Sequence, residues 1–275
     1  MLVNLHDVLD DAQRNHYAVG LFNTIDTDMV EAVIAAAEET GSPVIIGTAE
    51  VLLPYGELKL IMPSMVEAAK RATVPVVVHF DHGVTFERCM EALQLGCTSI
   101  MFDGSAGAFE ENLKNTKEMV KIAHAMGATV EGEIGHVGQA NVGDHEHDDN
   151  YTSVETAVRF AKETGVDALA IAIGTAHGAY RSKPNLDMER LKEIRSALNT
   201  PLVLHGGSGL SDDDFRNTIK YGIAKINIFT DTCVAGLDAV KHGEGSYLEI
   251  REMKVKAMKQ SVIQKMKLFG SVGRC

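Results

Sequence analysis

Three histidines, His82, His177 and His205, each lie at the end of an apolar stretch of the sequence. The segments that carry them read VVVHFDHG, ALAIAIGTAHGAY and PLVLHGGSG. Each apolar stretch is typical of a buried strand in a parallel sheet. In a barrel of alternating strands and helices, the carboxyl ends of all strands meet at one face, where active sites form. The three imidazoles could therefore converge on one metal ion, and three histidines with an open fourth position suit a catalytic zinc.

A carboxylate precedes the first of these histidines. Because neighbouring side chains of a strand point in opposite directions, Asp81 could face the barrel axis and exchange protons while His82 faces the rim and binds metal. A core or capping role for the pair is the alternative. His79 shares a face with Asp81 and is expected to be a hydrogen-bonded interior histidine rather than a ligand.

Two glycine-rich or polar turns predict an anion site beside the metal. The turn after His205 offers a cluster of backbone N–H groups from Gly206, Gly207, Ser208 and Gly209. The run NIFTD at 227–231 places Thr230 and further amides at a helix N-terminus, a second favourable place for phosphate oxygens. Loops after the seventh and eighth strands often bind phosphate in such barrels.

Three carboxylates end the fourth and fifth predicted strands. Asp103 ends one, and Glu131 and Glu133 share a face of the other by the period of two. They could orient the ligand histidines or offer the metal another position. Interior salt bridges are the equally weighted alternative.

The elements that position these residues alternate regularly. Amphipathic helical patterns separate eight strand-like runs, and a basic-faced helix follows at 247–268. This alternation predicts one (β/α)8 barrel domain over residues 1–275, whereas one miscounted strand would allow a doubly wound open sheet. The runs are 17–23, 44–48, 74–80, 98–103, 128–134, 167–173, 201–205 and 223–228.

Composition excludes several classes of partner. The chain has 38 acidic and 26 basic residues, and its net charge of −12 argues against nucleic acid and anionic membranes. No apolar stretch approaches the roughly 18 residues of a membrane span. The N-terminus does not read as a signal peptide, and the four cysteines lack CxxC spacing, so a reduced cytoplasmic location is expected.

With these motifs assembled, the sequence resembles the class II, zinc-dependent ketose-phosphate aldolases, near the tagatose- and fructose-bisphosphate branch. The similarity extends over the whole length. It rests on YAVGLFNT, HFDHG, MFDGS, VEGEIG, GTAHGAY, PLVLHGGSG, KINIFTD and KMKLFGSVG, which occur in the family's order. The resemblance implies a homodimeric or homotetrameric barrel that cleaves a ketose 1-phosphate or 1,6-bisphosphate into dihydroxyacetone phosphate and an aldehyde through a zinc-stabilised enediolate.

The resemblance also implies residue roles. His82, His177 and His205 would hold Zn²⁺, and Asp81 would exchange a proton with the hydroxyl on the cleaved carbon. Gly178 and the turns at 206–209 and 227–230 would bind the 1-phosphate, often with Na⁺ or K⁺ nearby, and Asn227 would also contact the reacting donor.

The sequence departs from the family pattern in three places. The connection 135–151 is a candidate lid or else a plain solvated loop. It reads GQANVGD where a proton donor is usual, so that role could pass to Asp144 or Glu146 or be absent. Arg181 stands where a lysine or serine often contacts the phosphate. Glu50 stands near the usual distal-phosphate serine, and Arg251 does not align with the usual arginine. A substrate with an unphosphorylated tail is therefore as plausible as a bisphosphate.

Three other functions stay open at the level of sequence. A Schiff-base aldolase would need an interior lysine, for which Lys225 is the candidate. A zinc-dependent sugar-phosphate epimerase or isomerase would need bases on both sides of the substrate. A non-catalytic sugar-phosphate-binding protein would have lost a metal ligand or the base. The three histidines and Asp81 are nevertheless all present.

Overall fold

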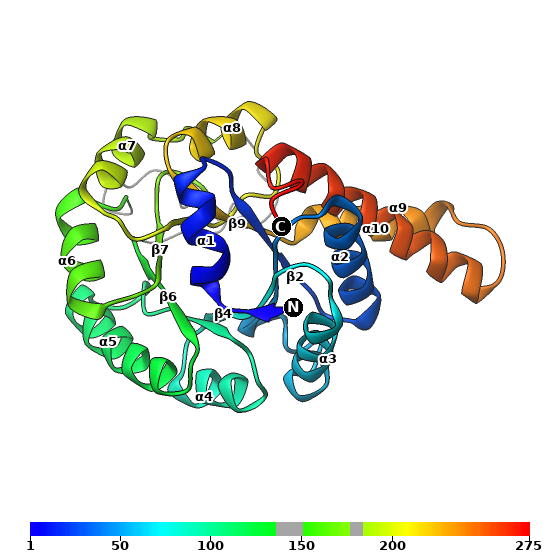
Figure 1. Cartoon of the computed structure of the whole chain (residues 1–275), viewed down its shortest axis with the longest axis horizontal. Helices are drawn as coiled ribbons and strands as arrows, with labels where there is room; N and C mark the ends of the chain where they lie inside the picture. The colour runs from blue at the N-terminus through cyan, green and yellow to red at the C-terminus, as the bar shows by residue number, and fades with distance from the viewer. Residues whose placement is uncertain (136–150, 177–183) are drawn as a thin grey trace.

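The eight predicted strands form one closed parallel barrel (Figure 1). The computed structural model describes residues 1–135, 151–176 and 184–275. Neighbouring barrel strands pair in parallel all the way round, and the β2–β9 and β4–β5 pairings close the ring. This closure confirms the (β/α)8 prediction and rules out the open sheet. The barrel strands are β2 (Val19–Asn23), β3 (Val44–Ala49), β4 (Val76–Gly83), β5 (Ser99–Phe102), β6 (Thr129–Ile134), β7 (Ala168–Ile171), β8 (Leu202–Leu204) and β9 (Ile223–Ile228).

Helices surround this barrel, and two of them show clear capping chemistry at both ends. Asp26 caps the first turn of α2 through the N–H of Met29, and Gly41 ends that helix in the left-handed conformation. Ser153 and Gly165 play the same two roles for α6. The helices are α2 (Thr27–Thr40), α3 (Leu58–Arg71), α4 (Phe86–Gln94), α5 (Phe109–Ala125), α6 (Val154–Thr164), α7 (Met188–Ala197) and α8 (Asp212–Lys220), and a short 3₁₀ turn, η1 (Glu50–Leu52), follows β3.

The N-terminal segment contains elements that the strand count did not predict. A two-residue strand, β1 (Leu2–Val3), pairs with the start of β4, and α1 (Leu5–Arg14) follows it. The buried residues of α1, among them Leu5 and Leu9, pack against Val77, Val203 and other residues inside the barrel. In Figure 1, α1 lies across the middle of the helix ring. Helix α1 therefore closes the amino-terminal end of the barrel and leaves the carboxyl end for a site.

Two helices follow the last strand. The predicted basic-faced helix is α10 (Tyr247–Phe269), and α9 (Thr230–His242) precedes it. Helix α10 packs against α2, where Arg251 and Lys254 both pair with Asp28. In Figure 1 the far ends of α9 and α10 extend beyond the helix ring.

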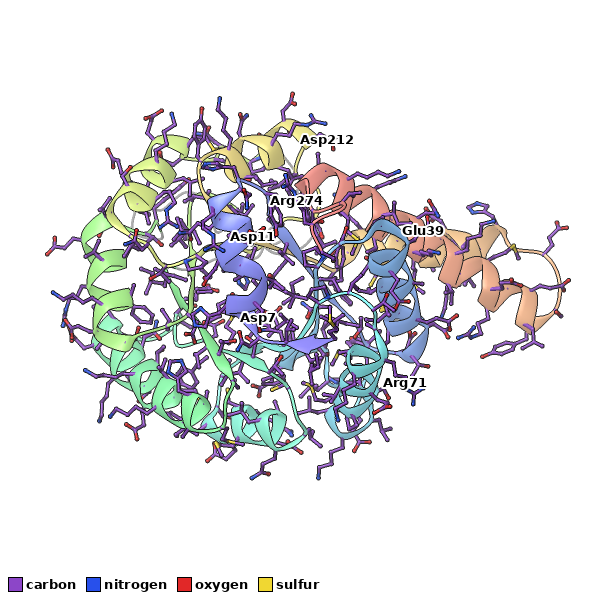
Figure 2. All side chains as sticks on the ribbon, viewed as in Figure 1. Asp7, Asp11, Glu39, Arg71, Asp212 and Arg274 are labelled. Carbon is purple, nitrogen blue, oxygen red and sulfur yellow. The ribbon has the colours of Figure 1, made fainter. Side chains whose placement is uncertain are left out.

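Charged side chains cover the outer helices. Figure 2 labels examples on α1, α2, α3 and α8, namely Asp7, Asp11, Glu39, Arg71 and Asp212. The strands, by contrast, bury almost all of their residues. In the described part of the chain, no helix combines the length and apolarity that crossing a membrane requires.

Candidate active site

The carboxyl ends of the strands surround a pocket of about 600 Å³. The predicted residues that line it are Asp81, His82, Asp103, Glu133, Gly206, Gly207, Ser208, Asn227 and Thr230. Glu50, Val51 and Leu52 of η1 form part of its wall, together with Val84. Segments far apart in the sequence therefore meet where the strand-end rule placed them.

An irregularity in β4 brings Asp81 and His82 to the same cavity. The pairing with β5 joins Phe80 to Ile100 and Gly83 to Phe102, so one extra residue lies on β4. Such a bulge bends the strand and redirects side chains. His82 adopts φ +47°, a left-handed conformation that non-glycine residues rarely take. The expectation that one side chain would face the axis and the other the rim is therefore wrong, because the bulge breaks the alternation.

Two histidines from opposite sides of the barrel meet at this pocket, where His82 forms part of the lining and His205 is fully buried behind it. The Nε2 atom of His82 lies 2.8 Å from Nδ1 of His205. On the other side of each ring a carboxylate accepts a hydrogen bond. Asp103 Oδ2 lies 2.7 Å from Nδ1 of His82, and Glu131 Oε1 lies 2.8 Å from Nε2 of His205.

These carboxylates fix which ring nitrogens can bind a cation. Burial raises the pKa of Asp103, but hydrogen bonding to His82 and that ring's charge outweigh it and hold the pKa well below its usual range. Burial likewise raises the pKa of Glu131, and the charge of Lys225 with the His205 hydrogen bond brings it down to about 2. Both groups are thus ionised and accept the ring N–H groups, which leaves Nε2 of His82 and Nδ1 of His205 facing each other. A proton on one of these nitrogens satisfies both, and the same two nitrogens could bind a cation.

The surrounding charge favours a cation at this point. Burial lowers the pKa of His82, but Asp81, Asp103 and Glu133 outweigh it and raise the pKa to about 10. Asp81, His82 and His205 bring one ligand atom each within 4.8 Å of one another, as do His82, Asp103 and Glu133. The donor set of imidazoles held by carboxylates is the one that zinc prefers.

The two glutamates of β6 differ in their surroundings. Glu131 is paired, because its Oε2 lies 2.8 Å from Nζ of Lys225. Glu133 Oε2 is buried without a hydrogen-bond partner among the described residues and lies 4.0 Å from Nδ1 of His205. Burial, together with the charge of Asp103, raises the pKa of Glu133 to about 8. Glu131 therefore orients a histidine, whereas Oε2 of Glu133 could meet a cation.

Asp81 is held as an ionised carboxylate by two amides. Asn23 Nδ2 donates to Oδ2 at 2.8 Å, and Asn227 Nδ2 lies 3.1 Å from both carboxylate oxygens. Burial raises the pKa of Asp81, but the charges of His82, His205 and Lys225 outweigh it and keep that pKa well below its usual range. The carboxylate is therefore available to accept a proton.

His79 lies in the interior, where Nδ1 is 2.7 Å from the Ser99 hydroxyl. Burial lowers the pKa of His79 to about 3, so the ring is neutral. Its ligand atoms could join Asp81 and Glu131 in a third cation group. The ammonium of Lys225 already pairs with Glu131, however, and would repel a second cation there. The interior role predicted for His79 is confirmed.

The opposite wall of the pocket consists of the turn after β8 and the start of α9. Gly206 has φ +65°, and a Cβ there would collide with the backbone of Ala176, so this position requires glycine. Helix α9 has no side-chain cap at Phe229, which leaves its first amides to other acceptors. Gly207, Ser208 and Thr230 line the pocket beside them, whereas Gly209 is not among its lining residues. This wall suits an anion.

Some predicted site residues lie outside the described residues, and some residues found at the site were not predicted from the sequence. His177, Gly178, Arg181, Asp144 and Glu146 belong to the first group. Asn23 and Ser105 belong to the second. Asn23 ends a predicted strand, so the rule that selected Asp81 could have found it. Ser105 was less accessible to prediction, since its role is to donate to Asp103 from within a turn.

The sequence matches the family described as "Fructose-bisphosphate aldolase class-II" over residues 3–274. The chain belongs to this family of lyases. The family in general depends on zinc and acts on phosphorylated sugars. The resemblance inferred from the motifs and the enzyme class are thereby confirmed, while the roles of individual residues remain predictions.

Related proteins match this aldolase over nearly their whole length. The crystal structure of the YdjI aldolase from Escherichia coli K12 is 41% identical, with a TM-score of 0.92 over 100% of this chain and 99% of that one. A fructose-bisphosphate aldolase of Staphylococcus aureus (strain Mu50) is 36% identical over 99% of both chains. The structure of a putative fructose-1,6-biphosphate aldolase from Coccidioides immitis is 29% identical, with a TM-score of 0.90 over 98% and 97% of the chains.

Proposed function

We propose that this aldolase cleaves a ketose 1-phosphate reversibly into dihydroxyacetone phosphate and an aldehyde with the help of Zn²⁺. The observation that carries the proposal is the meeting of Asp81 with the His82–His205 pair beside the turn at 206–208. The base, the His82 ligand and the anion wall then line one pocket with His205 directly behind it, an arrangement that suits aldol cleavage of a sugar phosphate.

The metal would be held by His82 and His205, and by His177 as the family resemblance implies. Glu133 supplies a further oxygen on the same side. Bound zinc would act as a Lewis acid that stabilises the negative charge developing on the donor half. The carboxylates of Asp103 and Glu131 keep the two rings in the orientation that this binding needs.

Asp81 is the proposed acid and base. In the cleavage direction it takes the proton of the hydroxyl on the carbon whose bond breaks, and in condensation it returns that proton. Asn23 and Asn227 fix the carboxylate through their amide N–H groups, so its oxygens are oriented before the substrate arrives. We propose Asp144 or Glu146 as the proton donor for the donor half, at a place where the sequence departs from the family pattern.

The phosphate would bind at the wall formed by the turn after β8 and the first turn of α9. Amides of Gly206, Gly207 and Ser208 and the Thr230 hydroxyl line this side. The family resemblance adds further groups to this proposed phosphate site. They are Gly178, Arg181, Gly209 and a monovalent cation, Na⁺ or K⁺. Binding energy gained here positions the bond that breaks at the metal.

The far end of the pocket favours an uncharged tail. Glu50 lies there beside the apolar Val51 and Leu52. Its Oε2 accepts a hydrogen bond from the N–H of Val84 at 2.9 Å. A carboxylate repels a second phosphate. Arg251 pairs with Asp28 and Glu31 on the outer helices and is therefore engaged elsewhere. We propose a monophosphate substrate on these grounds, and a homodimer or homotetramer by family resemblance.

A cleavage assay tests this function. Ketose 1-phosphates and 1,6-bisphosphates would be supplied with and without EDTA, and release of dihydroxyacetone phosphate measured. We expect release that EDTA abolishes and zinc restores, with monophosphates preferred. No release from any ketose by zinc-loaded protein would contradict the proposal and favour an epimerase, which a coupled assay for the epimer would detect.

A borohydride experiment separates the Schiff-base alternative. Lys225 is fully buried, pairs with Glu131 and Asn227, and is not among the residues that line the pocket in the described part. Borohydride with substrate should therefore leave activity intact, and covalent trapping of the donor on Lys225 would overturn the metal mechanism.

A further inference from the structure

Lys225 lies on β9 beneath the pocket and is fully buried. A lysine is rarely buried to this extent unless its ammonium is paired. Here the Nζ atom has two close partners that belong to different parts of the site. The proposed chemistry gives this residue no direct contact with substrate, so its position needs another explanation.

The first partner leads to the metal side. Nζ lies 2.8 Å from Glu131 Oε2, and the other oxygen of that carboxylate lies 2.8 Å from Nε2 of His205. The ammonium lowers the energy of an ionised Glu131 in a fully buried position. An ionised Glu131 in turn accepts the His205 N–H and directs the opposite ring nitrogen toward His82.

The second partner leads to the base. Nζ lies 2.7 Å from Oδ1 of Asn227, and Nδ2 of the same amide lies 3.1 Å from both oxygens of Asp81. Because the ammonium can only donate, it fixes the carbonyl end of the amide on its own side. The amide N–H groups are thereby turned toward Asp81. A flipped amide would bring two acceptors together instead.

We infer that Lys225 is a positioning residue whose one ammonium sets both the metal-holding His205 and the carboxylate Asp81. The inference rests on the proposed function. It predicts that one substitution will weaken metal binding and slow the reaction at saturating metal, since the two effects travel through different partners. A lysine that served only to fill the interior would produce neither effect beyond a general loss of stability.

The test uses Lys225→Met, which keeps an unbranched side chain one atom shorter and removes the donor. Zinc affinity is measured by competition with a chromophoric chelator, and kcat and KM are measured at saturating zinc. We expect zinc to bind about 10- to 100-fold more weakly, as for other groups that orient metal ligands. We also expect kcat to fall about 100-fold with KM changed little, because a misplaced reacting group costs that much.

Thr218→Val is the control. Thr218 is equally buried, but its hydroxyl donates to the carbonyl of Phe215 within α8, and no described contact links it to Glu131 or Asn227. Its zinc affinity and kcat should stay close to those of the parent. If the effects of Lys225→Met do not exceed those of this control, the inference is wrong.

A double variant covers the case in which Lys225→Met does not fold. Removing one partner of a buried ion pair leaves an uncompensated charge, whereas removing both is often tolerated. Lys225→Met/Glu131→Gln should therefore fold, and it should keep the low kcat because Asn227 is still unheld. Parent-like kcat in this variant would overturn the inference. A parent chain that neither binds zinc nor cleaves any ketose would instead overturn the proposed function.

Discussion

The two ends of the barrel contrast in composition although the same strands build both. At the amino-terminal end, Val19, Leu21, Val77 and Val203 meet the apolar face of α1. At the carboxyl end, the barrel strands lead to Asp81, Glu133, His205 and Asn227, all buried and all polar. The first end gains stability from apolar burial. The second buries charges that cost free energy unless they are paired, so stability and chemistry are separated along each strand.

The largest effect should come from the polar end. Asp81→Asn keeps the size of the side chain but removes the proton acceptor, so kcat should fall by about 10²–10⁴-fold. The free energy of unfolding should fall, since the positive charges that hold the pKa of Asp81 below its usual range lose their partner. Steady-state kinetics and urea unfolding on the same preparation measure both. A variant that keeps about a tenth of the parent kcat would contradict the role of Asp81 as acid and base.

The apolar end should respond in the opposite way. Leu9 of α1 is fully buried, and Leu9→Ala should lower the free energy of unfolding by about 2–5 kcal/mol. The kcat of the folded fraction should stay near the parent value, since α1 closes the end away from the pocket. If kcat falls together with stability, the two ends are not independent.

In metal-free protein, the pH dependence of the free energy of unfolding should reveal the raised pKa of Glu133. Its folded pKa of about 8 lies above the ordinary value of 4.5, so the native state holds this proton more tightly than the unfolded state. The contribution is present below about pH 4.5 and is lost as pH rises toward 8. Urea unfolding in EDTA at several pH values should show this decline, and Glu133→Gln should lack it. Parallel curves for the two proteins would refute the assignment.

The smallest effect concerns the far end of the pocket. Glu50→Gln removes the charge that opposes a second phosphate and should shift the ratio of kcat/KM for bisphosphate over monophosphate upward by about tenfold. Glu87→Gln, on the exposed face of α4, is the matched control. An unchanged ratio in Glu50→Gln would remove Glu50 from the determinants of specificity.

Much of this arrangement follows from sequence rules, and the failures have physical reasons. The eight strands and their polar ends were predictable because apolar stretches and strand ends are local signals. Helix α1 was missed although its Asn4–Asp7 capping box was readable, since no strand of the repeat precedes it. The bulge at Asp81 could not be predicted, because it depends on the register with β5. The different fates of Glu131 and Glu133 depend on Lys225, which approaches from across the barrel.

The bulge in β4 also limits how this centre could be moved. A designer who grafts Asp81, His82 and their partners onto straight strands of another barrel would reproduce the residues and lose their convergence, because adjacent side chains would again diverge. The graft would have to carry the extra residue of β4, the left-handed backbone at His82 and the tightly packed Gly83 as one unit. Libraries that vary side chains on a fixed regular backbone would therefore never sample this centre.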